Sequence, residues 1–193
     1  MRVGLIDVDG GNRFPNIALM KISAWHKAQG DEVSWYEPFD GWYDLVYMSK
    51  VFDDTYTPDM PEPYNTAEVI KGGTGYGLDN KLPPEIESTE PYYFPEEDTS
   101  YGFITRGCIR NCWFCKVPKY EGKLTVYNRV EDIVKHKKVS FLDNNILAYP
   151  GHMDVFQWLI DRRQRCEFNQ GLDFRLVNDE NLDALSRLNY MGD

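Results

Sequence analysis

The chain has 193 residues, and its 42% hydrophobic content is enough to bury a core in one large domain or two small ones. The net charge of −10, from 31 acidic and 21 basic residues, repels phosphate backbones and anionic lipids, so neither nucleic acid nor a membrane is an expected partner. No apolar run reaches the roughly 18 residues of a membrane helix, and Asp7 and Asp9 interrupt the N-terminus too early for a signal peptide, which predicts a cytoplasmic protein.

The first part of the chain is predicted to form a small α/β layer. An apolar, β-branched run leads into Asp9-Gly10-Gly11, which is typical of a strand that ends in a tight turn. Helical spacing of apolar residues follows, with Pro15 suited to the first turn and Gly30 to the end. We expect a strand at 3–8, a helix at 15–30, and strands at 33–36 and 43–48. This order predicts a domain over residues 1–54 with a parallel core.

Residues 55–98 lose this periodicity and are predicted to be a linker between domains. They contain seven prolines and the glycine-rich run Gly72-Gly73-Thr74-Gly75-Tyr76-Gly77. No Lys-Ser/Thr pair follows these glycines, so a structural turn is favoured over a phosphate-binding loop.

A second series of elements begins after the linker and is predicted to form a domain over residues 99–193. We expect strands at 101–105, 139–142 and 166–169, and helices at 130–136, 153–162 and 181–188. Repeated βα units imply parallel strands, whose ligands collect at the carboxyl ends of the strands. Residues 99–193 hold 14 basic and 12 acidic residues, whereas residues 1–98 hold 7 and 19, so an anionic group could bind in the second half.

Three of the four cysteines lie within eight residues, in the loop after the strand at 101–105. Cys108, Cys112 and Cys115 have C-x3-C-x2-C spacing. In a reducing compartment such thiols favour metal binding over disulfides, and thiolates suit iron-sulfur clusters or zinc. Three thiolates on a [4Fe-4S] cluster leave one iron open to a further ligand.

This motif, with an aromatic residue before the last cysteine, resembles the signature of the radical S-adenosylmethionine (SAM) enzymes. The resemblance implies a [4Fe-4S] cluster on the three cysteines and SAM on the open iron, with Phe114 beside the adenine. It also implies an electron donor such as flavodoxin or ferredoxin and a 5′-deoxyadenosyl radical that abstracts hydrogen from a substrate. The sequence does not identify that substrate.

Polar residues after the next two predicted strands occupy positions where this family binds SAM. They are Asp143, Asn144 and Asn145 after one strand, and Gln170, Asp173 and Arg175 after the other. A polar turn at 143–145 is an equally good interpretation, and Asp173 and Arg175 could pair only with each other. Basic residues around the thiols are expected to offset the charge of the cluster. These are Arg106, Arg110, Lys116, Lys119 and Lys123, with Glu121 opposing them.

The N-terminal domain resembles the cobalamin-binding-like domain that precedes the radical SAM core in one branch of the family. The predicted architecture is therefore α/β, with a doubly wound Rossmann or flavodoxin-like domain before a partial (βα) radical SAM barrel. Asp9 stands where the cobalamin signature needs a histidine, so cobalamin binding through a His ligand is not expected.

Two alternatives remain open at this point. The first is a structural zinc site completed by Cys166, His136 or His152, in a non-catalytic metal-binding module. The second is an inactive fragment, because the family's barrel has six βα units and this chain accommodates about three. An open edge after the third strand would then favour a partner chain or self-association.

Overall fold

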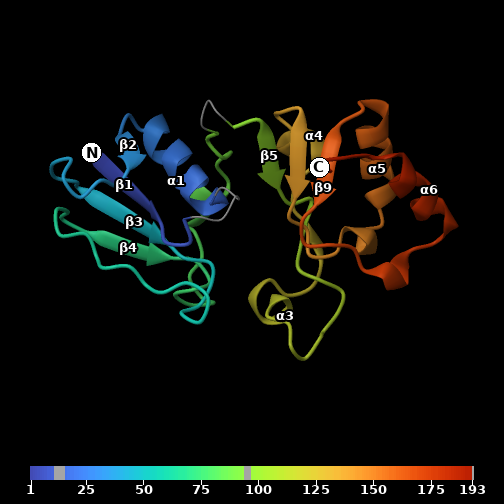
Figure 1. Cartoon of the computed structure of the whole chain (residues 1–193), viewed down its shortest axis with the longest axis horizontal. Coiled ribbons are helices and arrows are strands. Elements are labelled where there is room, and N and C mark those ends of the chain that lie inside the picture. Colours follow the sequence, from blue (N-terminus) through green and yellow to red (C-terminus); the bar gives the residue numbers. More distant parts are fainter. Residues whose placement is uncertain (11–15, 94–96, 193) are drawn as a thin grey trace. The chain divides into compact units, whose positions relative to one another are not determined.

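The computed structural model describes residues 1–10, 16–93 and 97–192, and it divides into two compact units, Met1–Phe94 and Pro95–Asp193 (Figure 1). Each unit contains a four-stranded sheet in which all neighbouring strands are parallel. The predicted class, mixed α/β with parallel sheets, is confirmed.

The first unit has the sheet order β2-β1-β3-β4, with β1 inside the sheet. Its elements are β1 (Arg2–Asp7), α1 (Ile17–Ala28), β2 (Glu32–Trp35), β3 (Leu45–Ser49), β4 (Val69–Gly72) and α2 (Pro84–Glu87). The first four agree with the predicted spans to within about two residues. Asn16 caps α1, its side chain accepting the Leu19 N–H. Pro15 and Gly11 lie outside the described residues.

Both faces of the first sheet are covered, which explains why β1 is an almost continuous apolar run. On one face Val3 and Leu5 pack with Leu19 and Ile22 of α1. On the other face, loop residues and neighbouring strands contribute a second buried cluster. Its buried members are Ile6, Val8, Tyr43, Val46 and Met48.

The segment predicted as a linker is largely part of the first unit, which corrects its expected role. β4 pairs with β3, and Ile86 of α2 is buried in the cluster that α1 covers. Gly73, at φ 94°, belongs to a turn that packs on the backbone of Lys50, as a structural turn requires. The linker prediction was wrong here because β4 and α2 are only four residues long and stand among prolines and glycines, so neither shows a clear period.

The second unit has the sheet order β10-β9-β8-β5, so each strand lies beside the strand that precedes it in this sheet. Its strands are β5 (Thr99–Gly102), β6 (Thr105–Arg106), β7 (Thr125–Val126), β8 (Lys138–Phe141), β9 (Arg165–Phe168) and β10 (Asn189–Tyr190). Its helices are α3 (Val117–Tyr120), α4 (Val130–Ile133), η1 (Ile146–Ala148), α5 (His152–Asp161), η2 (Phe174–Leu176) and α6 (Asp179–Arg187). Helices α5 and α6 pack side by side (Figure 1).

A single buried cluster holds the second unit together. Val139 and Phe141 of β8 and Cys166 of β9 are fully buried in it, and Phe156 and Leu159 of α5 pack in the same cluster. The apolar residues of α5 recur at helical spacing, which is why this helix was predictable.

Two predicted elements of the second unit differ from the structure, and one strand was not predicted. The strand at 101–105 is divided, because β5 ends at Gly102 and Thr105–Arg106 pairs antiparallel with β7 instead. The helix at 130–136 is a single turn, α4. A fourth parallel strand, β10, follows α6 and was not predicted, so β10 and not β9 forms that edge of the sheet. Two-residue strands carry too little periodicity to be recognised.

Within the described residues, no helix combines the length and the apolar composition that a membrane span requires.

A buried polar network joins the end of α1 to the sheet of the first unit. His26 is 1% exposed; its Nδ1 lies 2.7 Å from Asp31 Oδ2 and its Nε2 lies 3.1 Å from the Tyr47 hydroxyl. The terminal amine of Met1 donates to Asp31 Oδ1 at 2.8 Å. Both bonds hold the pKa of Asp31 below its usual value, and the bond from the terminal amine has the larger effect.

We predict that Asp31→Asn lowers the urea midpoint of the first unit at neutral pH. A lowered carboxyl pKa contributes stability above the unfolded pKa of about 3.9, and this contribution is lost as pH falls through the folded pKa. The difference between wild type and variant should therefore shrink in acid. Asp79→Asn, at an exposed site, is the matched control. Equal midpoints for the wild type and Asp31→Asn at pH 7 would contradict the assigned role.

Candidate functional site

A cavity of ≈ 380 Å³ lies in the second unit, at the carboxyl ends of its strands. Three loops line it: one follows β6, one follows β8 and one follows β9. The lining residues are Cys108, Arg110, Cys112 and Cys115 from the first loop, Asn144 and Asn145 from the second, and 170–175 from the third. The predicted gathering of ligand residues at this edge of a parallel sheet therefore corresponds to a cavity in the structure.

The cysteine loop is folded on itself by local hydrogen bonds. The Cys115 N–H donates to the Cys112 carbonyl at 3.1 Å, and the Arg110 N–H donates to Cys108 Sγ at 3.4 Å. At the base of the loop, the Cys108 N–H donates to the Gly122 carbonyl at 3.2 Å. All three thiols are free and all three line the cavity. Their close sequence spacing thus brings them to one place.

The cavity offers three thiols as candidate ligands of a metal centre. Among the residues that the structure describes, no group of three or more His, Cys, Asp or Glu side chains is arranged to hold one metal ion. A single zinc ion needs every ligand atom within about 2.3 Å of one point. Thiolates that bind an iron-sulfur cluster each contact a different iron, and can therefore stand farther apart.

The three candidates for a fourth zinc ligand lie outside the cavity. Cys166 is fully buried in the core, and burial raises the pKa of its thiol to about 12. The Nδ1 of His136 lies 3.0 Å from the Ser100 hydroxyl, and the Nδ1 of His152 lies 2.6 Å from the Tyr149 carbonyl. The geometry therefore gives no support to the zinc alternative.

Glu121 connects the cysteine loop to the loop after β8. Its Oε2 accepts the Gly107 N–H at 2.7 Å and the Asn144 amide N–H at 2.8 Å, and its Oε1 pairs with Arg106 at 3.0 Å. The side chain is only 12% exposed. The sequence indicated Glu121 merely as a charge opposite the basic residues, and no motif signals this connecting role.

The loop after β8 presents amides to the cavity, whereas Asp143 is turned away from it. Asp143 is 2% exposed and accepts the Ile104 and Thr105 N–H groups at 3.0 and 2.6 Å and the Thr105 hydroxyl at 2.7 Å. Burial raises the pKa of this carboxyl, although these bonds oppose the shift. Asp143 does not line the cavity, so its position supports the structural interpretation.

Asn145 lines the cavity and has a buried amide oxygen. The side chain is 2% exposed and lines the cavity, with its Nδ2 4.0 Å from Cys108 Sγ. Its Oδ1 is buried without a hydrogen-bond partner in the described part of the chain. A buried amide oxygen without a partner is costly, and Asn145 is therefore a candidate ligand-contacting residue of this cavity.

The third loop places two arginines around one carboxylate. Arg175 donates from Nε to Asp173 Oδ1 at 2.7 Å and from Nη2 to Oδ2 at 3.2 Å, and Arg110 donates from Nε to Oδ2 at 2.8 Å. The Arg175 bond, supported by Arg110, holds the pKa of Asp173 well below its usual range. The expected pair of Asp173 and Arg175 is present, and Arg110 joins it.

The aromatic residues of the cysteine loop are exposed. Phe114 is 73% exposed and Trp113 is 93% exposed, with their rings edge to face at 5.5 Å. Phe114 does not line the cavity, but Phe174, which the sequence did not indicate, lines it and is 81% exposed. The cavity thus brings together the predicted residues Cys108, Cys112, Cys115, Asn144, Gln170, Asp173 and Arg175, but not Phe114 or Asp143.

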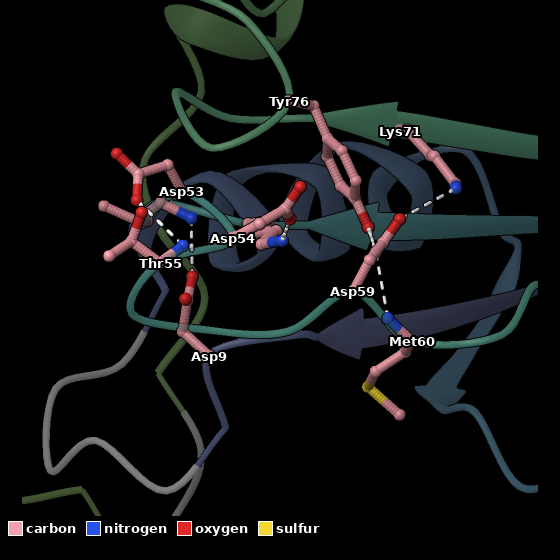
Figure 2. Close-up of polar contacts among 10 residues, drawn as sticks. Asp9, Asp53, Asp54, Thr55, Asp59, Met60, Lys71 and Tyr76 are labelled. Carbon is pink, nitrogen blue, oxygen red and sulfur yellow. Dashed lines mark hydrogen bonds and ion pairs between the residues drawn. The ribbon is translucent and has the colours of Figure 1, made fainter.

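The first unit holds Asp9 at the position where a cobalamin-binding histidine would stand. Its carboxylate accepts the Val51 N–H, and the residue is 9% exposed (Asp9 in Figure 2). Nearby loop carboxylates are also engaged: Asp54 pairs with Lys50, and Asp59 accepts the Tyr76 hydroxyl at 2.5 Å. Asp9 is thus part of the connection between the loops after β1 and β3.

We predict that Asp143→Asn accelerates hydrogen exchange at the Ile104 and Thr105 amides by about tenfold or more. The variant replaces a charged acceptor whose bonds are worth roughly 1.5–3 kcal/mol each, and 1.4 kcal/mol corresponds to a factor of about ten. Peptide-level exchange over residues 103–107 measures the effect. Asp183→Asn, on the exposed surface of α6, is the control. Unchanged exchange in Asp143→Asn would show that this carboxylate does not hold the segment.

Comparison with known proteins gives one distant relative. No family model matches the chain. Over 162 residues the chain is 23% identical to the ribosomal protein uS12 methylthiotransferase RimO of Helicobacter hepaticus (strain ATCC 51449 / 3B1). The aligned region covers 76% of this chain and 35% of the relative, so the chain spans about a third of the relative's length. This similarity gives a distant suggestion of the radical SAM superfamily and of an enzyme of that type.

Proposed function

We propose that this protein is a radical SAM enzyme whose [4Fe-4S] cluster is held by Cys108, Cys112 and Cys115. The observation that carries the proposal is the convergence of these three free thiols on one cavity, beside the unpaired amide oxygen of Asn145. Soft thiolates suit iron, and three of them leave one iron for another ligand. The distant similarity to a methylthiotransferase supports the same conclusion.

The proposed architecture follows the same comparison. The parallel order β5-β8-β9-β10 is the order in which the first strands of a (βα) barrel succeed each other, and it supports a partial radical SAM barrel in the second unit. The order β2-β1-β3-β4 supports a Rossmann or flavodoxin-like first unit. In the first unit, the carboxylate of Asp9 is consistent with no cobalamin bound through a histidine.

The residues around the cysteines have separate proposed roles. Asn144, Asn145 and Gln170 offer amide groups to the polar end of SAM, and exposed Phe114 offers a ring to its adenine. Glu121 keeps the first two loops together while the ligand binds. When bound, the cluster and SAM supply a 5′-deoxyadenosyl radical for hydrogen abstraction from a substrate.

Two partners complete the proposal. An electron donor such as flavodoxin or ferredoxin supplies the electron that reduces the cluster. The four cysteines are free thiols, so we also propose that the protein works in a reducing compartment such as the cytoplasm. A second chain or a second copy at the β10 edge of the sheet remains a prediction.

The competing function is a non-catalytic metal-binding module. A structural zinc site usually has four protein ligands, and neither Cys166, His136 nor His152 lines the cavity. The cysteine motif and the geometry therefore favour the cluster. Reconstitution of the protein with iron and sulfide separates the two functions.

We predict that anaerobic reconstitution with iron and sulfide yields about four irons per chain, and that alanine at any of Cys108, Cys112 or Cys115 abolishes cluster binding. Cys166→Ala is the matched control, because this thiol is buried in the core and should not affect the iron content. Iron analysis and the absorbance of the cluster measure the result. Equal iron in all four variants, or a colourless protein with one zinc, would contradict the proposal.

We also predict that SAM shifts the electron paramagnetic resonance signal of the reduced, reconstituted protein. A shift requires an iron that is open to an added ligand, whereas a closed four-ligand cluster would give the same signal with and without SAM. S-adenosylhomocysteine is the comparison ligand. Production of 5′-deoxyadenosine from SAM under reducing conditions then tests the activity itself.

A further inference from the structure

We propose that Arg110 and Arg175, braced by Asp173, bind an anionic group of the substrate, a carboxylate or a phosphate, at the cysteine cavity. The identification of this cavity as the place where a substrate reacts rests on the proposed function. The existence of an anion site rests on the geometry of the three side chains alone.

The hydrogen bonds to Asp173 leave most N–H donors of the two guanidinium groups free. Both carboxylate oxygens of Asp173 accept hydrogen bonds, which come from the Nε groups of the two arginines and from Nη2 of Arg175. Within the described chain, Nη1 and Nη2 of Arg110 and Nη1 of Arg175 have no hydrogen-bond partner. Arginine presents its donors in a planar fork that matches the oxygens of carboxylates and phosphates.

The charge balance and the exposure of these residues favour an anion. Two positive groups surround one carboxylate, so the trio has a surplus positive charge. Asp173 is 9% exposed, whereas the side chains of Arg110 and Arg175 are 34% and 66% exposed, so the carboxylate is covered and the guanidinium groups remain accessible.

The position of the trio distinguishes it from a surface ion pair. All three residues line the cavity that the thiols also line, and they come from two different loops. The thiolates of Cys112 and Cys108 contribute to a raised Arg175 pKa, after the larger effect of Asp173. Exposed Phe174 lies between Asp173 and Arg175 in sequence and adds an apolar face to the same cavity. A ligand with an anionic group and an apolar or flat body fits this combination.

The first arm of the test measures anion binding without a cluster. Titration calorimetry with inorganic pyrophosphate compares the wild-type chain with Arg175→Gln and Arg110→Gln. We expect each variant to bind about tenfold more weakly, because a charge-assisted hydrogen bond is worth roughly 1.5–3 kcal/mol. Arg187→Gln, an exposed arginine paired with Asp183 on α6, is the control and should bind as the wild type does. Equal affinity in Arg175→Gln and wild type overturns the proposal.

The second arm identifies the source of the anionic group, using the reconstituted protein and SAM. The resemblance found in the sequence places Arg175 among the SAM-binding positions, so this arm decides between the two ligands. If the arginines bind the substrate instead, Arg175→Gln should leave the SAM affinity unchanged. If the SAM affinity falls by the same factor as pyrophosphate binding, the group bound is the carboxylate of SAM and the assignment to the substrate is overturned. Failure of every chain to assemble a cluster would contradict the proposed function alone, since the first arm gives its result without one.

Discussion

Parallel strand pairing is the constraint on which the arrangement of the second unit depends. Two parallel neighbours cannot be joined by a hairpin, so the chain returns through a crossover after each strand and every strand ends at the same edge of the sheet. The segment that follows β5 through β6 and the loops after β8 and β9 therefore meet there, although residues 108, 144 and 173 are far apart in sequence. The cavity is a consequence of this topology, and the side chains of the loops decide its chemistry.

The carboxylates of Asp143 and Glu121 hold these loops in place, because each accepts hydrogen bonds from several donors of the loops. Asp143 accepts the backbone N–H groups of Ile104 and of Thr105, the first residue of β6, and so ties the start of β6 to the loop after β8. Glu121 joins Gly107 to Asn144 across two loops. A buried carboxylate is unfavourable unless several donors compensate for its lost hydration, so each residue depends on the loops it connects.

The basic character of the second half has a more specific meaning in three dimensions than in sequence. Arg106 and Arg110 precede or lie within the cysteine motif, and their charges were expected to balance a cluster. Each is paired with a carboxylate, Arg106 with Glu121 and Arg110 with Asp173. Arg175 shares Asp173 with Arg110 and adds a second positive charge at the cavity, although it lies 60 residues beyond Cys115 and the spacing of the motif alone does not connect it with the thiols.

The sequence by itself determined the α/β class, most elements of regular length and the candidate cysteines, because periodicity and ligand spacing are local properties. The helices α5 and α6 bury one stripe of side chains, and three thiols within eight residues need no long-range contact to converge. Only the tertiary structure decided that β4 and α2 belong to the first unit, that β10 is a strand, and that Asp143 is structural while Asn145 faces the cavity. Neighbouring residues on a loop differ little in sequence pattern, and their roles depend on which distant donors and acceptors the folded chain brings to them.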